Sequence, residues 1–168
     1  MRSAYGAEEI RIGGHLVTIV VDVANVMGSR PDGWWRDRAG AAARLHAEIV
    51  RLAASGRAIP PDDSAGPDDN AGPDDNAGPP AFVLVLEGAA KAAPIPVATE
   101  PGSADPVQPG QVRVVHARGS GDDAIVAVVR ELPGRRIVVT ADRELRDRSV
   151  AAGATILGPS WLLGLLND

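Results

Sequence analysis

The chain has 168 residues, 45% of them apolar and 3% aromatic, which predicts one domain with a core built mainly from Val, Leu, Ile and Ala. It contains no cysteine, so disulfides and cysteine-ligated zinc or iron–sulfur centres are excluded. The formal net charge of −5 depends on six aspartates between positions 60 and 80, because the rest of the chain carries 17 basic against 16 acidic residues.

The first half of the chain is expected to form two strands and one long helix. An apolar run predicts a strand over 16–22, and the polar segment 28–33 predicts a loop. Apolar residues at helical spacing predict a helix over about 37–55, which Gly56 is placed to end. A second apolar run predicts a strand over 81–87.

A direct repeat of six residues separates that helix from the second strand. Ala-Gly-Pro-Asp-Asp-Asn occurs at 65–70 and again at 71–76, with almost nothing to bury. We therefore expect a disordered low-complexity insertion at about 57–80 within a single domain over 1–168.

The second half of the chain continues the alternation of strands and helices. A helical turn at 89–93 and a Pro-rich loop precede three further strands, expected at 111–116, 136–140 and 154–157. Helices are expected from near Asp122 to Pro133-Gly134, over 143–152, and over 161–166 with Ser160 as its cap. This pattern predicts an α/β fold, a three-layer sandwich with a mostly parallel sheet of about five strands.

The first four predicted strands each lead to carboxylates, namely Asp22, Glu87, the pair Asp122 and Asp123, and Asp142. Because parallel strands point the same way, these acids are expected at one edge of the sheet, where open α/β folds bind ligands. Five like charges in one crevice repel one another unless a cation lies among them. The sequence therefore predicts that these acids hold Mg²⁺ or Mn²⁺.

The segment 119–124, Gly-Ser-Gly-Asp-Asp-Ala, has two opposed interpretations. It matches the dinucleotide fingerprint G-x-G-x-x-A between a predicted strand and a predicted helix, with Asp142 about twenty residues further on. A dinucleotide site offers bare N–H groups to a pyrophosphate. The two carboxylates here would repel that phosphate and would suit a cation, so the segment favours metal binding.

Each candidate catalytic residue also has a structural interpretation. Asp122 and Asp142 can cap helices, Glu87 can turn outward at the rim of the sheet, and Asn25 can support a turn instead of orienting a water or phosphate. The predicted catalytic residues are Asp22, Asn25, Asp122, Asp123 and Asp142. The histidines lack ligand spacing and are expected to be structural or solvated: His15, His46 and His116.

Two adjacent tryptophans stand among arginines between positions 30 and 38. Such rings suggest base stacking and phosphate contact, and the alternative is that at least one ring covers the core. Without the aspartate-rich segment and the five candidate acids, the chain carries +6, which suits either a polyanionic substrate or an ordinary solvated surface. The residues predicted to contact substrate are Arg30, Trp34, Trp35, Arg36, Arg118 and Ser120.

Three motifs at the predicted strand ends are informative together: Val-Asp22-Val-Ala-Asn25-Val, Gly-Ser-Gly-Asp122-Asp123-Ala-Ile and Val-Thr-Ala-Asp142-Arg-Glu-Leu. In this order they resemble the NYN domain family, in particular its bacterial YacP-like branch, which belongs to the PIN-like nucleases. The resemblance extends from about residue 17 to the final helix, without the repeat.

The resemblance implies a PIN-like fold and a metal-dependent ribonuclease. By position, the family's acidic ligands match Asp22, Asp122 or Asp123, and Asp142, and its asparagine matches Asn25. Two departures are Val23, where glycine is common, and Glu87, where aspartate is common.

The leading hypothesis is therefore hydrolysis of RNA phosphodiester bonds at a carboxylate-bound Mg²⁺ or Mn²⁺ site. One alternative is a nucleotide pyrophosphohydrolase that uses the same metal site, and another is a PIN-like module that binds RNA without turnover. The charged first residues, 1–11, contain no apolar signal region and no apolar run approaches membrane-spanning length, so a cytoplasmic protein is expected.

Overall fold

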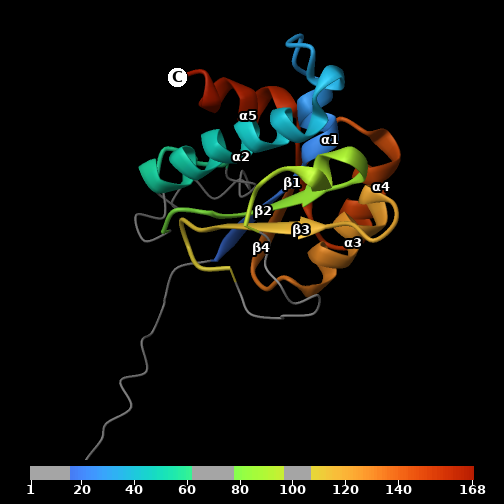
Figure 1. The fold of residues 1–168 in the computed structure, drawn as a ribbon. Coiled ribbons are helices and arrows are strands. Elements are labelled where there is room, and N and C mark those ends of the chain that lie inside the picture. Colours follow the sequence, from blue (N-terminus) through green and yellow to red (C-terminus); the bar gives the residue numbers. More distant parts are fainter. Residues whose placement is uncertain (1–15, 62–77, 97–106) are drawn as a thin grey trace, which may run out of the picture.

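The computed structural model describes residues 16–61, 78–96 and 107–168 (Figure 1). Its centre is one all-parallel sheet with the strand order β3-β2-β1-β4-β5. The strands are β1 (Val17–Asp22), β2 (Ala81–Leu86), β3 (Val112–His116), β4 (Arg135–Val139) and β5 (Thr155–Leu157). The predicted α/β fold with a parallel five-stranded sheet is confirmed, and it is consistent with a PIN-like fold.

Helices cover both faces of the sheet, which makes three layers (Figure 1). The helices α1, α2 and α5 lie over one face, and α3 and α4 lie over the other. Their bounds are α1 (Val23–Gly28), α2 (Arg38–Ser55), α3 (Gly121–Glu131), α4 (Arg143–Ala151) and α5 (Pro159–Leu166). Two short 3₁₀ helices, η1 (Trp34–Arg36) and η2 (Gly88–Ala92), lie in the connections that follow β1 and β2.

Alternate residues of the central strand β1 supply the two hydrophobic cores. Ile19 and Val21 pack toward α2, whereas Val20 packs toward α3 and α4, and all three side chains are fully buried. This alternation follows from the period of two in a strand, with both faces of the sheet covered.

The connectivity of the sheet reverses at β1. From β1 the chain adds β2 and then β3 on one side, and it then returns to add β4 and β5 on the other side. The switch point of the topology therefore lies between the carboxyl ends of β1 and β4, which is where open α/β folds bind ligands.

The long helix α2 begins and ends as the sequence predicts. Asp37 is its N-cap and accepts a hydrogen bond from the Gly40 N–H at 2.9 Å. Gly56 follows the helix with φ 66°, a left-handed conformation that glycine adopts without steric cost.

Two helix starts differ from the sequence expectation. The helix α1 was not predicted, and it begins directly after β1 because Asp22 caps it. The prediction that Ser160 caps the last helix is wrong, since α5 starts earlier, at Pro159, and its N-cap residue Gly158 offers no side chain. Proline suits this first helical position because its missing N–H needs no partner there.

The predicted insertion at 57–80 is described only at its two ends. Residues 62–77, which contain the repeat, lie outside the described residues, and so does His15. In the part of the chain that the structure describes, no helix is long and apolar enough to cross a membrane.

Candidate active site at the carboxyl edge of the sheet

Asp22 is the buried carboxylate of the candidate site. It ends β1 and is 8% exposed. Its Oδ2 accepts a hydrogen bond from the Thr140 hydroxyl at 2.9 Å, and its Oδ1 accepts one from the Asn25 N–H at 3.3 Å. Burial raises the pKa of Asp22 to about 6, and the negative charges of Asp122 and Glu87 add to this effect against the two hydrogen bonds.

Thr140 joins the two sides of the switch point. Its fully buried hydroxyl donates to Asp22 and also accepts a hydrogen bond from the Asp142 N–H at 3.1 Å. From the sequence, Thr140 is expected only to end a strand. The signal for its role is a polar residue that closes an apolar run two positions before a candidate acid.

Asn25 forms a second bridge across the switch point. Its Oδ1 accepts a hydrogen bond from the Ala141 N–H at 2.8 Å, so the side chain ties α1 to the loop after β4. Within the described residues its Nδ2 has no protein acceptor, which leaves a donor available for a water or a phosphate oxygen. The structural and the catalytic interpretations of Asn25 are therefore compatible.

Asp142 and Asp122 both lie at the start of a helix, but only Asp142 is a cap. Its Oδ1 accepts a hydrogen bond from the Leu145 N–H at 2.9 Å, as the structural interpretation predicts. The alternative interpretation of Asp122 as a cap does not hold, because Ser120 caps α3 and accepts a hydrogen bond from the Asp123 N–H at 3.1 Å. Asp122 thus has no capping role, and its carboxylate remains available for a ligand.

The charge around Asp122 is negative. Burial raises the pKa of its carboxyl, the charges of Asp142 and Glu87 raise it further, and Arg148 partly opposes them. The charges of Asp122 and Glu87 thus act on Asp22, and those of Asp142 and Glu87 act on Asp122. Within the described residues, however, no three of these acids lie close enough together to hold a metal ion.

Asp123 differs from its neighbour in both exposure and pairing. Its side chain is 73% exposed, and its Oδ1 lies 2.7 Å from Nη2 of Arg148. This hydrogen bond lowers the pKa of Asp123, which is the opposite direction to the shift at Asp122. Of the two adjacent acids, Asp123 is the one already neutralised by a protein cation.

Glu87 holds the start of α3. Its Oε2 accepts a hydrogen bond from the Gly121 N–H at 2.6 Å, which connects the end of β2 to the helix that carries Asp122. A Cβ at Gly121 would collide with this carboxylate, so the Glu87 side chain would have to move away and give up the contact. Glu87 therefore faces the first turn of α3 and satisfies one of the N–H groups that a helix start leaves without a partner.

Gly121→Ala is expected to displace the Glu87 carboxylate and to lower the free energy of unfolding by about 1 kcal/mol, because it loses a hydrogen bond to a charged group worth about 2 kcal/mol and gains about 1 kcal/mol from alanine in place of a helical glycine. Chemical denaturation would measure this loss. The matched control is Gly119→Ala, because a Cβ at Gly119 meets nothing within 4 Å. Equal stability of the two variants would contradict a role for Glu87 in holding α3.

The fold is similar to that of Rae1 (YacP) from Bacillus subtilis. The crystal structure of a point mutant of that protein superposes with a TM-score of 0.53 at 12% sequence identity, covering 90% of this chain and 74% of that chain. At this identity the likeness concerns the fold. Rae1 carries the name YacP, which is also the name of the family branch that the three sequence motifs resemble. No protein-family model and no curated protein matches the sequence.

The two tryptophans have different environments. Trp34 packs against the core, as the structural interpretation predicts for at least one ring, whereas Trp35 is 57% exposed. Their rings meet edge to face with centroids 6.3 Å apart. The guanidinium of Arg36 lies 5.9 Å from the centroid of Trp35, and that of Arg38 lies 5.4 Å from the centroid of Trp34. The inner ring thus supports an outer ring that is open to solvent.

The remaining predicted contacts to substrate are placed as follows. Arg30 is engaged in an ion pair with Glu48 on α2, at 2.5 Å. Ser120 uses its hydroxyl to cap α3, and Arg118 is exposed in the loop before it. Among the arginines predicted to contact substrate, Arg118 therefore lies close to Asp122 and Asp123 in the sequence and has an exposed side chain that a ligand can reach.

Proposed function

We propose that this protein is a metal-dependent ribonuclease that hydrolyses RNA phosphodiester bonds at the carboxyl edge of the sheet. The observation that carries the proposal is the buried Asp22, with a pKa of about 6, coupled to Asp122 at the switch point of a PIN-like fold. A buried acid that repels its acidic neighbours is costly to a fold, and such groups cluster at functional sites.

The donor atoms at this edge suit a small divalent cation. Among residues 16–61, 78–96 and 107–168, no group of three or more His, Cys, Asp or Glu is placed so that together they could hold a metal ion. Mg²⁺ is commonly held by only one or two carboxylates, with waters and substrate phosphates completing its shell. Asp22 and Asp122 would hold Mg²⁺ or Mn²⁺, and Asp142 and Glu87 are further candidate ligands. Asp123 would join them only if its ion pair with Arg148 opened. When bound, the ion would lower the pKa of a water and stabilise charge on the phosphate.

The chain's own groups would prepare this site for a phosphodiester. Above pH 6 Asp22 is ionised, and the hydroxyl of Thr140 and the N–H of Asn25 fix both of its oxygens. The free Nδ2 of Asn25 would donate to a water or to a phosphate oxygen. Ordering of this kind before substrate arrives reduces the cost of reaching the reactive geometry.

The proposal is tested by incubating the purified full chain with single-stranded RNA oligomers in Mg²⁺, in Mn²⁺ and in a chelator. Cleavage that requires the metal supports a ribonuclease. Release of pyrophosphate from nucleoside triphosphates, with intact RNA, would replace the proposal by a pyrophosphohydrolase. RNA binding without turnover in either metal would replace it by a non-catalytic RNA-binding module.

We further propose that Trp35 stacks on an unpaired base of the RNA. Its ring is exposed, is supported from the side by Trp34 and carries Arg36 next to it, so one surface offers both an aromatic plane and a positive charge. Stacking on a base is worth about 1–3 kcal/mol by alanine substitution.

Trp35→Ala is therefore expected to weaken the binding of single-stranded RNA by about tenfold, within the range that stacking gives. Fluorescence anisotropy of a labelled oligomer, in a chelator that prevents cleavage, would measure the affinity. Trp35→Phe is the matched control, because it keeps an aromatic plane and should bind within about threefold of the wild type. Equal binding by the alanine and phenylalanine variants would disprove stacking at this position.

A further inference from the structure

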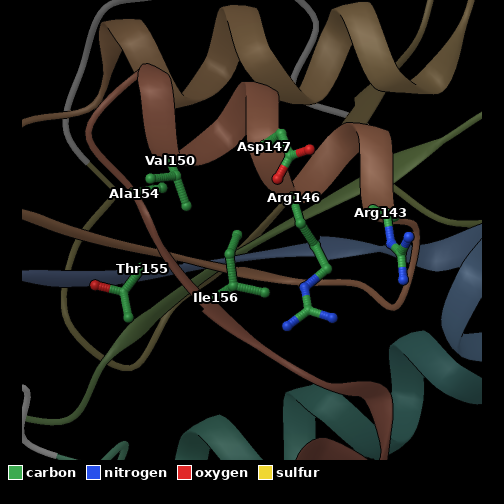
Figure 2. A pocket seen from close by; sticks show the side chains of 7 residues that line it. All are labelled: Arg143, Arg146, Asp147, Val150, Ala154, Thr155 and Ile156. Atoms are coloured by element: carbon green, nitrogen blue, oxygen red, sulfur yellow. The ribbon is translucent and has the colours of Figure 1, made fainter.

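A groove of about 710 Å³ runs between α4 and the edge strand β5, outside the set of residues assigned to the candidate site (Figure 2). Its wall is formed by one side of α4, and its floor by the chain that enters β5. The lining residues are Arg143, Arg146, Asp147, Val150, Ala154, Thr155 and Ile156.

The periodicity of α4 explains why this groove stays open. Leu145 and Ser149 are buried against the sheet, four residues apart on the inner side of the helix. The lining positions 143, 146, 147 and 150 recur at helical spacing on another side of α4. Since β5 is the last strand of the sheet, no further strand lies beyond it in the described part of the chain to cover this side.

Positive charge gathers at one end of the groove. In Figure 2 the guanidinium groups of Arg143 and Arg146 lie at the same end, and the carboxylate of Asp147 lies along the helix from them. Within the described ranges, neither guanidinium has an ion-pair partner. The next arginine of the helix, Arg148, is by contrast paired with Asp123.

The basic end is also the end closest to the candidate site. Arg143 directly follows Asp142, the cap of α4, and Asp142 is linked through Thr140 to Asp22. Arg146 stands one turn further along the helix, about 5–6 Å away between Cβ atoms. A strand that leaves the carboxylates past the start of α4 would therefore meet both guanidinium groups in succession.

We propose that Arg143 and Arg146 bind the phosphates of the RNA strand next to the scissile bond, so that the basic end of the groove carries the substrate away from the site. This inference rests on the proposed ribonuclease function. Arginine suits the task, because its planar fork of N–H donors matches the oxygens of a phosphate and stays charged at any working pH. The apolar side chain of Val150 and the carboxylate of Asp147 cannot bind a phosphate. The RNA strand is therefore expected to follow only the basic end of the groove.

The experiment measures the binding of the full chain to a single-stranded RNA oligomer over a range of salt concentrations, in a chelator. Each phosphate contact contributes about 0.7 to the slope of log K against log salt for single strands. The double variant Arg143→Ala and Arg146→Ala should therefore reduce the slope by about 1.4. Both side chains are exposed, so the variant should fold normally.

Two control variants separate this path from general charge. Arg130→Ala removes an exposed arginine near the end of α3, close to where the strand β4 begins and so at the end of the sheet away from the carboxylates. It should leave the slope unchanged. Asp147→Asn should tighten binding by about twofold, because it removes a negative charge beside the path. An unchanged slope in the double variant, with normal wild-type binding, would overturn the groove inference alone. A wild type that neither binds RNA nor cleaves it in Mg²⁺ or Mn²⁺ would overturn the proposed function and this inference together.

Discussion

Asp22→Asn is expected to abolish metal-dependent RNA cleavage and at the same time to stabilise the fold. The loss of activity follows because the amide cannot supply the negative charge that holds a divalent cation. The gain in stability follows because the carboxylate is 8% exposed and its pKa is raised to about 6. Above that pH the native state must keep a buried negative charge beside two other acids, which the variant avoids.

Because the pKa of Asp22 is raised in the folded protein, the difference in stability between the wild type and Asp22→Asn depends on pH. In the unfolded chain Asp22 ionises near its ordinary value of 3.8, whereas in the folded protein it stays protonated up to about pH 6. Between these values the folded state binds more protons, so the wild type loses stability as pH rises through this window. The pKa differs by about two units, and each unit corresponds to about 1.36 kcal/mol. The free energy of unfolding of the variant should therefore exceed that of the wild type by at most about 3 kcal/mol above pH 6, and the two should be equal near pH 3.

Chemical denaturation of both proteins in a chelator, at pH values from 4 to 8, would measure this difference. Asp147→Asn serves as the control, because its exposed carboxylate should leave the stability within about 0.5 kcal/mol of the wild type. A variant at Asp22 that cleaves RNA normally would remove this residue from the site. A variant that is less stable than the wild type at pH 8 would show that the hydrogen bonds to Asp22 outweigh its burial.

The layout of the sheet was predictable because its strands carry their own signal. Short apolar runs located the strands to within a residue or two at each end, and the acids that follow the first four strands marked the carboxyl edge. Parallel strands then required those acids to lie at one edge, whichever strand order the chain adopted. This inference needed only the direction of the strands and no knowledge of their contacts.

The contacts within the site were not predictable, because they join residues far apart in sequence. Thr140 reaches Asp22 across 118 positions, and Asn25 reaches Ala141 across 116. No local pattern specifies which hydroxyl or amide meets which partner, since the order β1-β4 decides it. The same limit applies to the cap of α3. A shift of the helix start from Asp122 to Gly121, with Ser120 as its cap, changes Asp122 from a capping residue into a free carboxylate.

The two adjacent acids of α3 are expected to respond very differently to the same substitution. Asp122→Asn should lower metal-dependent cleavage by at least about a hundredfold, because its carboxylate shares the field of Asp22, Glu87 and Asp142 and has no capping duty. A loss of this size corresponds to about 3 kcal/mol of transition-state stabilisation, within what a metal ligand supplies.

Asp123→Asn should retain activity within about threefold of the wild type, since Asp123 is exposed and already paired with Arg148. Its stability should stay close to that of the wild type, because an exposed ion pair contributes little to folding. Single-turnover cleavage of RNA and metal titration by calorimetry would compare the variants, and each serves as the other's control for charge and position. Equal losses would place both carboxylates on the metal, as the sequence first suggested, and would require the Arg148 pair to open when the ion binds. A loss of activity confined to Asp123→Asn would make Asp123, and not Asp122, the metal ligand. The raised pKa of Asp122 would then reflect only its burial and its acidic neighbours.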